Sequence, residues 1–346
     1  MRALARAEAR RLVAHFGAFG AREVEAPILL DADALLDLYG EDVRARAFTT
    51  HGPRGELMLR PDFTVPVVRM HMETEADPAR YAYAGEVFRR ADDAPAESLQ
   101  AGYEVFGAEP AEADAEVFRA LSTAVADLPL RAAIGDVGLL RAATAGLSTS
   151  EARRAALLRH LWRPRRFTAL LERFAAPPAP RAPARVPEGV PEIGARTRAE
   201  VEERLRLLDA DRDAPLVGAE EVRLIEALLA LRAPAPQALA RLREVAAELP
   251  AVGGAVDAFA RRLDALAARG VAVDALGFEG SFGRTTLEYY DGFVFGLFAD
   301  ARPDLPPVAT GGRYDALTAA LGGGRRVPAV GGVVRPEVVL ALRGLA

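Results

Sequence analysis

The segment 81–107 constrains the fold more than any other part of the chain, because its side chains alternate as they do in paired β-strands. Every second residue from Tyr81 to Arg89 shares one face of a first arm, and Gln100, Gly102 and Glu104 share one face of a second arm. The connection 90–98 carries two aspartates and a proline, which suit a link between strands better than the interior of a helix. The segment therefore predicts an antiparallel hairpin.

The polar face of this hairpin has two interpretations. Glycine inside a strand often marks a place where a ligand or another part of the protein comes close to the backbone, and Gly102 stands between two polar side chains. By pattern alone, the commoner explanation is the solvated side of an antiparallel sheet. The rest of the sequence has to decide between a small polar ligand site and a solvated sheet face.

The composition excludes several kinds of chemistry. The 346 residues contain neither cysteine nor lysine. Disulfides, thiol nucleophiles and thiolate zinc sites are therefore excluded, as are Schiff bases and the Walker A phosphate loop. The chain has 44 arginines instead, and their planar guanidinium groups suit the binding of carboxylates and phosphates. The net charge of -5 argues against a protein that lives on nucleic acid.

The sequence also shows no membrane or metal signal. No run approaches the roughly 20 apolar residues of a membrane helix, and the arginine-rich N-terminus lacks the apolar core of a signal peptide. We therefore expect a cytoplasmic protein without a membrane association. His15 and His71 lie on expected helices, and His160 and Trp162 are expected core or boundary residues. Because no histidine and carboxylate cluster has metal-ligand spacing, no metal and no cofactor are expected.

The periodicity predicts an α+β protein with a helical insertion. Residues 1–143 and 269–346 form the two parts of one core, and 144–268 form an insertion rich in Ala, Leu, Arg and Glu at helical spacing. A proline-rich interval at 176–191 interrupts the insertion. The elements expected in the core are a helix at 1–20 with Leu4, Leu12, Val13 and Phe16 inward, a strand at 24–30, a helix at 31–39, a second hairpin at 47–59, a helix at 65–72, a helix at 111–126, a strand within 132–140 that ends at a turn at 135–138, strands at 287–298 and 307–310, and a last helix from Pro336.

Five motifs resemble the histidyl-tRNA synthetase family, and they occur in that family's order. Because five ordered motifs are far more specific than one, the resemblance covers nearly the whole chain except the insertion. It implies a class II aminoacyl-tRNA synthetase-like antiparallel sheet of six or more strands, flanked by helices, with a histidine pocket on the sheet and a dimer formed through the first helix and strand. The motifs are LRPDFT at 59–64, YAGEVFR at 83–89, LQAGYEVFG at 99–107, LEYYDGFVF at 287–295, and GGRYDAL with VPAVGGVVR at 311–335.

The resemblance implies which residues bind histidine. Asp62 and Thr64 match the positions that hold the amino group, although the family has glutamate where Asp62 stands. Gln100 and Glu104 match the positions that hold the amino acid and its ring. The list is completed by four further residues, namely Arg89, which matches the arginine that holds the α-phosphate of ATP, Tyr289 and Tyr290, which match the tyrosines beside the imidazole, and Arg284.

Two of these assignments carry a geometric condition. In a strictly extended strand Tyr289 and Tyr290 point to opposite faces, so only one of them would face the ligand unless a bulge intervenes. The family's catalytic arginine stands four residues before the first tyrosine, where this chain has Thr285, and Arg284 lies one residue further away. A slip of one residue in or near a strand turns a side chain elsewhere, which argues against activation of histidine by ATP. The strand before Arg335 resembles the third of the three motifs that define class II synthetases, and Arg335 lies near the arginine of that motif.

Two further departures concern tRNA. The hairpin 81–107 resembles the second class II motif, whose loop is basic in the family. Here the loop residues 91–98 are acidic and would repel a phosphate backbone. The family continues past the third class II motif into an anticodon-binding domain, whereas this chain ends about one helix after Arg335. We therefore expect no anticodon-binding domain and no tRNA binding.

A histidyl-tRNA synthetase core that keeps the histidine residues and loses tRNA recognition resembles the regulatory subunit family of ATP phosphoribosyltransferase. The resemblance implies a non-catalytic subunit that activates the short-form catalytic subunit and mediates feedback inhibition by L-histidine in the first step of histidine biosynthesis. It also implies a homodimer within a hetero-oligomer. The alternatives are a histidyl-tRNA synthetase helped by a separate tRNA-binding partner, another amino-acid-activating enzyme of class II type, and a scaffold with a vestigial pocket that does not bind histidine.

Overall fold

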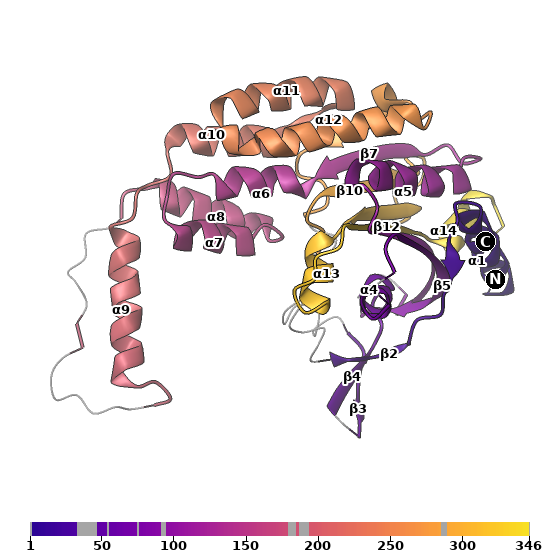
Figure 1. Cartoon of the computed structure of the whole chain (residues 1–346), viewed down its shortest axis with the longest axis horizontal. Coiled ribbons are helices and arrows are strands. Elements are labelled where there is room, and N and C mark those ends of the chain that lie inside the picture. Colours follow the sequence, from indigo (N-terminus) through magenta and orange to yellow (C-terminus); the bar gives the residue numbers. More distant parts are fainter. Residues whose placement is uncertain are drawn as a thin grey trace.

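A computed structural model describes residues 2–32, 47–53, 55–74, 76–90, 95–178, 185–186, 194–284 and 289–345. Its centre is a nine-stranded sheet with helices on both faces (Figure 1). The six central strands pair antiparallel, whereas the first strand and the eighth strand of the order pair parallel with their inner neighbours. The strand order is β1 (Arg22–Glu23), β5 (Ala79–Phe88), β6 (Glu97–Phe106), β12 (Ala329–Val334), β11 (Ala309–Arg313), β10 (Phe293–Phe298), β7 (Arg131–Asp136), β9 (Gly277–Glu279) and β8 (Arg232–Pro234).

Strands β5 and β6 form the hairpin that the alternation predicts. Their antiparallel register sets Tyr81 opposite Glu104, Tyr83 opposite Gly102, and Gly85 opposite Gln100. Directly opposed residues project to the same face of a sheet. The shared polar face predicted for the two arms is therefore confirmed.

The first face of the sheet holds the larger apolar core. Helix α5 (Pro110–Ala124) packs on β6, β10, β11 and β12, and helix α1 (Arg2–Gly17) packs on β5 and β6 beside the last helix, α14 (Pro336–Leu342). Helix α5 begins at a proline, and the side chain of Glu109 accepts a 2.9 Å bond from the Glu112 amide as its N-terminal cap. Leu12, Val13 and Phe16 are buried as predicted, but Leu4 is 50% exposed, so its core assignment was wrong.

The second face carries a smaller core with more aromatic side chains. It is covered by helices α4 (Thr64–Met72) and α13 (Asp315–Leu321) and by a three-stranded sheet. Strand β4 (Gly55–Leu59) lies in the middle of that sheet, between β2 (Leu29–Asp31) and β3 (Thr49–Gly52). The antiparallel pairing of β3 and β4 confirms the second predicted hairpin. Tyr83, Tyr289, Tyr290 and Tyr314 all belong to this core.

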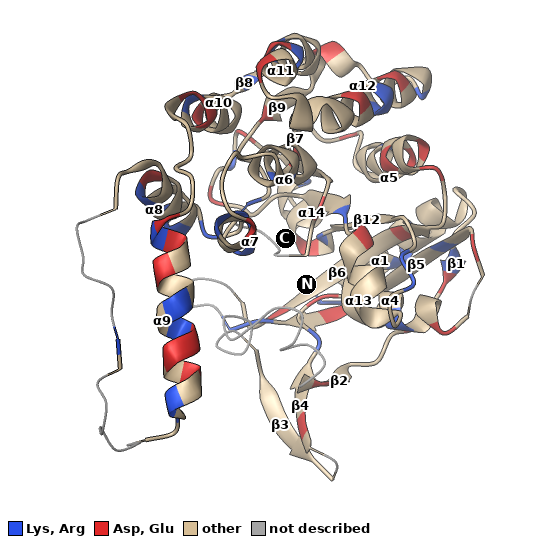
Figure 2. Cartoon of the chain, turned by 60° about the vertical axis from the view of Figure 1, so that its left-hand side comes forward, with Lys and Arg blue, Asp and Glu red and all other residues tan. Residues whose placement is uncertain are grey.

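The insertion is helical but not separate from the sheet. Its strand β8 pairs with β9, and helix α12 lies along α5 (Figure 1). Helix α9 has no buried residue and stands apart, with basic and acidic side chains along its length (Figure 2). Helix α6 (Val137–Ala145) leads from the core into the insertion. The helices of the insertion are α7 (Glu151–Arg159), α8 (Pro164–Ala175), α9 (Arg198–Arg212), α10 (Ala219–Ala230), α11 (Ala235–Glu248) and α12 (Gly253–Ala268), with a short 3₁₀ turn at Pro250–Val252, and a second 3₁₀ turn at Val273–Ala275 follows it.

Several predicted boundaries were wrong. The strand expected at 24–30 is wrong over most of its length, because β1 ends at Glu23 and the chain that contains Pro27 is not a strand. Only β2, which begins at Leu29 and belongs to the three-stranded sheet, overlaps the expected range. By contrast, the strand expected to begin at 132 and to end at the turn 135–138 is confirmed, since β7 ends at Asp136, which caps α6 by accepting a 2.8 Å bond from the Gly138 amide. The strand expected at 287–298 begins only at Phe293, and residues 285–288 lie outside the described residues, as do residues 33–39 of the helix expected at 31–39. No helix within the described ranges is long and apolar enough to cross a membrane.

Candidate functional site

A narrow cavity opens on the second face of the sheet, over β6, β11 and β12. Its volume is about 40 Å³, whereas one water molecule needs roughly 10–15 Å³, so an amino acid can enter only if lining side chains move. The lining includes six of the eight predicted histidine-binding residues. The full set of lining residues is Asp62, Thr64, Arg89, Gln100, Tyr289, Tyr290, Thr310, Gly332, Val333 and Arg335.

Glu104 lies beneath this lining and is fully buried. Its carboxylate accepts hydrogen bonds from Tyr83 at 2.7 Å, from Thr64 at 3.3 Å, and from Tyr314. Burial raises the pKa of Glu104 to about 7, with the negative charge of Asp62 adding to the effect, although the three donated bonds act in the opposite direction. Glu104 therefore does not line the cavity itself, and it contacts the lining through the bond from Thr64. Its predicted role in binding histidine stays a prediction.

Two arginines line the cavity. Nε of Arg89 donates a 2.7 Å bond to the carbonyl of Pro61, and Arg335 donates to the carbonyl of Pro307 at 2.6 Å and to the hydroxyl of Thr310 at 3.4 Å. Within the described parts of the chain, neither guanidinium forms an ion pair with a carboxylate. Burial, aided by the charge of Arg89, lowers the pKa of Arg335 to about 10. Such a pair of half-buried like charges favours binding of an anion.

Gln100 supplies an unused acceptor at the same cavity. Its side chain is only 3% exposed, and its Oε1 atom has no hydrogen-bond partner among the described residues. A buried acceptor without a partner costs about 1–3 kcal/mol, so such atoms are rare in folded proteins. An N–H donor of a bound molecule would satisfy this atom.

Both predicted tyrosines line the cavity, although an extended strand would allow only one. Tyr289 and Tyr290 precede β10 and lie in a turn, so the alternation of a strand does not apply to them. Their rings contact edge-to-face with centroids 5.0 Å apart, and the Tyr289 hydroxyl donates a 3.2 Å bond to Thr64. The expectation of opposite directions was wrong because the expected strand is shorter.

Arg284 lies apart from the cavity lining. Nε of Arg284 donates a 2.9 Å bond to the carbonyl of Leu161, and its guanidinium lies over the ring of Phe167, 5.0 Å from the centroid. Both partners belong to the helical insertion. In this structure Arg284 therefore joins the segment before the tyrosine pair to the insertion, and the structure does not bring it together with the other predicted site residues.

The sequence prediction omitted four lining residues: Thr310, Gly332, Val333 and Arg335. Arg335 carried a usable signal, since it stands near the third-motif arginine. The other three had none, because a threonine and small residues of a central strand are also ordinary sheet residues. Only the pairing of β12 with β6 and β11 brings them beside Gln100.

The cavity thus combines groups of opposite character. Asp62 and the Oε1 atom of Gln100 can accept hydrogen bonds from a ligand, and Arg89 and Arg335 can donate hydrogen bonds to it. A small zwitterion with a polar ring requires this combination, whereas a metal ion requires a group of close ligands. Among the described residues, no group of three or more histidine, aspartate or glutamate side chains could hold a metal ion.

Comparisons with known proteins agree with this architecture. The model of the histidyl-tRNA synthetase family matches residues 2–339. A crystal structure from Bacillus halodurans, described as an ATP phosphoribosyltransferase regulatory subunit/histidyl-tRNA synthetase, superposes with a TM-score of 0.72 at 22% identity, covering 99% of this chain and 79% of that one. A histidyl-tRNA synthetase from Nostoc superposes with a TM-score of 0.68 at 16% identity, covering 100% and 73%. These two structures show the fold alone, which is that of a class II synthetase core.

Closer sequence relatives identify the branch of this class. A protein of Agrobacterium fabrum named ATP phosphoribosyltransferase regulatory subunit is 34% identical over 369 aligned residues, covering 97% of this chain and 96% of the relative. A protein of the same name from Brucella ovis is 33% identical over 353 aligned residues, covering 93% of each. The chain belongs to the family of ATP phosphoribosyltransferase regulatory subunits. It is therefore a regulatory and not a catalytic subunit, as the sequence predicted.

Proposed function

We propose that this chain activates the short-form catalytic subunit of ATP phosphoribosyltransferase and mediates its feedback inhibition by L-histidine, which binds in the cavity over β6, β11 and β12. The catalytic subunit condenses ATP with phosphoribosyl pyrophosphate in the first step of histidine biosynthesis. We further propose that the chain acts in the cytoplasm as a homodimer within a hetero-oligomer of both subunits, without tRNA.

The unpartnered Oε1 atom of Gln100 carries the assignment of the ligand site. It is a buried acceptor at a cavity that Arg89 and Arg335 also line, and neither arginine has a carboxylate partner among the described residues. Histidine supplies a carboxylate for the arginines and N–H donors for Gln100 and Asp62. The ligand would thus relieve one unsatisfied acceptor and one like-charge repulsion together.

The site is built so that occupancy can change its surroundings. Because the cavity is smaller than an amino acid, binding moves side chains that come from β6, from the turn before β10 and from the end of β12. If the arrangement with histidine bound favours a less active catalytic subunit, linkage requires that the catalytic subunit in turn changes the affinity for histidine. A typical coupling free energy is about 1–3 kcal/mol.

The position of Arg284 counts against the alternative of an amino-acid-activating enzyme. Activation by ATP would need an arginine at the reacting carboxylate, and Arg284 is instead bonded to Leu161 of the insertion. After the β5–β6 loop, the described chain resumes at residue 95 and carries the acidic Glu97, which does not attract the phosphates of a tRNA.

Titration calorimetry with L-histidine tests the proposal, using the chain alone and in complex with the short-form catalytic subunit. Glu104→Gln removes a charge beneath the cavity, and Glu244→Gln is the matched control on an exposed part of α11. We expect saturable binding and inhibition of the complex, both weakened at least tenfold by Glu104→Gln and unchanged by Glu244→Gln.

Absence of histidine binding in both the chain and the complex would refute the sensor role and leave activation or scaffolding. Histidine-dependent exchange of pyrophosphate into ATP by the chain alone would instead support the synthetase alternative.

A further inference from the structure

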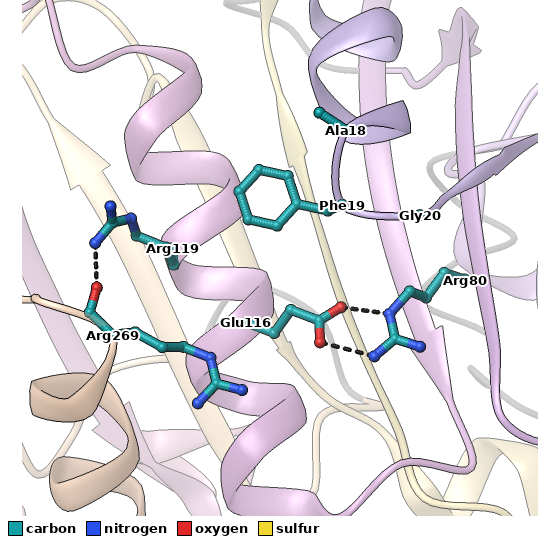
Figure 3. A pocket seen from close by; sticks show the side chains of 7 residues that line it. All are labelled: Ala18, Phe19, Gly20, Arg80, Glu116, Arg119 and Arg269. Carbon is teal, nitrogen blue, oxygen red and sulfur yellow. Dashed lines mark hydrogen bonds and ion pairs between the residues drawn. The ribbon is translucent and has the colours of Figure 1, made fainter.

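A second hollow lies on the opposite face of the β5–β6 hairpin from the histidine cavity (Figure 3). Its volume is about 590 Å³, within the roughly 300–1,000 Å³ typical of small-molecule sites. The residues that line it come from the end of α1, from β5, from α5 and from the segment after α12. They are Ala18, Phe19, Gly20, Arg80, Glu116, Arg119 and Arg269.

The hollow is positively charged although the whole chain is acidic. Three arginines stand against two carboxylates, Glu116 in the lining and Glu112 beside it, whereas the net charge of the chain is -5. Figure 3 shows the arginines arriving from three different elements. A local positive surplus on an acidic protein attracts anions to one place.

Two of the three arginines already have carboxylate partners. Arg80 donates bonds of 2.6 and 2.8 Å to the two oxygens of Glu116, and Arg269 pairs with Glu112. Burial alone would raise the pKa of Glu116, but the bonds from Arg80 and Tyr103 outweigh it and lower the pKa, so this carboxylate is charged at neutral pH. The charge of Arg80 is therefore balanced within the protein.

Arg119 is the exception. Its Nη1 atom donates to the backbone carbonyl of Arg269, and no carboxylate pairs with it in the part of the chain that the structure describes. A guanidinium has five N–H donors in a planar fork that matches phosphate oxygens. The contact with the carbonyl fixes the orientation of the group and leaves donors for a ligand.

The ring of Phe19 gives the hollow an apolar wall beside these charges (Figure 3). It is half-buried, and its neighbours include the rings of His15 and Tyr103 with centroids 5.4 and 6.2 Å away. A ring held in this way can support a flat or apolar part of a ligand at little entropic cost. The hollow therefore offers an arginine for an anion and a fixed ring for an uncharged part.

We propose that this hollow binds a phosphomonoester of a sugar or nucleoside, with its phosphate on Arg119 and its uncharged part against Phe19. The site is independent of the histidine cavity, because alternate residues of the hairpin face opposite sides of the sheet: Arg80 and Tyr103 face this hollow, and Tyr81 and Glu104 face the other side. A failure of the histidine proposal therefore leaves this one standing.

Calorimetric titration of the full chain with AMP, ribose 5-phosphate and adenosine tests the site. We expect saturable binding of one or both phosphomonoesters, and at least tenfold weaker binding of adenosine, which lacks the phosphate. If ribose 5-phosphate binds as tightly as AMP, the sugar phosphate suffices; tighter binding of AMP assigns the base to the wall at Phe19.

Variants then locate the binding. Arg119→Gln should weaken it at least tenfold, whereas Arg241→Gln on exposed α11 should leave it unchanged. Arg119→Lys keeps the charge but loses the planar fork, so it should also weaken binding even if Arg119→Gln fails to fold. Arg89→Gln, in the proposed histidine cavity, should leave the binding of phosphomonoesters unchanged. The proposal is overturned if no phosphomonoester binds, if Arg119→Gln and Arg241→Gln behave alike, or if Arg89→Gln rather than Arg119→Gln abolishes binding.

Discussion

Tyr83 donates a 2.7 Å hydrogen bond to Glu104 across the space that Gly102 leaves on the neighbouring strand. A Cβ atom at Gly102 would collide with the Tyr83 ring, which stacks on Phe63 with centroids 4.2 Å apart. The space at Gly102 is therefore filled by the Tyr83 ring and not by a ligand. The glycine allows the ring of Tyr83 to lie over the hairpin and its hydroxyl to reach the Glu104 carboxylate beneath the cavity.

Gly102→Ala should destabilise the protein by about 1–3 kcal/mol, because both the alanine methyl group and the fully buried Tyr83 ring need the same space. Urea denaturation measures the loss. Gly254→Ala is the matched control, since a Cβ at this position of α12 has no neighbour within 4 Å. The control should be neutral or slightly stabilising, as expected for replacing glycine in a helix. Equal effects of the two substitutions would contradict the role given to Gly102.

The raised pKa of Glu104 predicts a specific pH dependence of stability. Burial raises the pKa of this carboxyl from 4.5 to about 7, so the folded state holds a proton that the unfolded chain has already released. The resulting contribution to stability is fully present below pH 4.5 and is lost as the pH rises to about 7. The loss amounts to roughly 3 kcal/mol.

Urea denaturation of the wild-type protein and of Glu104→Gln at several pH values isolates this effect. The difference in the free energy of unfolding between the two proteins should change by this amount between pH 4.5 and 7, because the other ionisable groups are common to both. A difference that stays constant over this window would show that Glu104 titrates elsewhere.

Gln100→Met should separate stability from binding. Methionine has a similar length, and it removes the buried Oε1 atom, which has no partner in the part of the chain that the structure describes. We expect the free energy of unfolding to stay the same or to rise by about 1 kcal/mol, since an unsatisfied acceptor is lost. Histidine affinity should fall at least tenfold for the same reason, because the ligand loses an acceptor. A large loss of stability would mean that Gln100 serves the fold and not a ligand.

The hairpin and most of the site could be predicted from sequence for a physical reason. Alternation over ten-residue strands fixes which face each side chain takes, so Gln100, Gly102 and Glu104 were assigned to one face correctly. The same rule misled at Tyr289 and Tyr290. Their aromatic and apolar context suits a strand, yet the chain turns there, and both side chains face the cavity.

Long-range pairing accounts for what the sequence did not reveal. Thr310 and Gly332 reach the cavity only because β11, β12 and β6 lie next to one another, and no local pattern specifies that order. Leu4 belongs to an amphipathic helix but lies at the edge of the face that packs on the sheet, so periodicity alone placed it inward. Arg284 was assigned by its spacing to the tyrosines, whereas a contact with the distant insertion decides its direction.

The insertion is joined to the core by a buried charge network that the helical pattern could not show. Arg262 of α12 donates 2.7 Å bonds to Asp114 of α5 and to Asp136 at the end of β7, and Asp114 also accepts bonds from Arg313 of β11. All four side chains are less than a tenth exposed. The guanidinium of Arg262 therefore neutralises charge at the junction of two sections of the chain.

Arg262→Met should cost about 3–5 kcal/mol, because it leaves buried carboxylates with one cation fewer, and urea denaturation measures that loss. Arg241→Met is the matched control, since Arg241 forms an exposed pair with Glu244 at 3.1 Å and should change stability by less than about 1 kcal/mol. Adding Asp136→Asn to Arg262→Met should recover part of the loss, because it removes one of the uncompensated charges. If the double variant is less stable than Arg262→Met by the full cost of Asp136→Asn alone, the two side chains are not coupled, and packing rather than charge holds the insertion on the core.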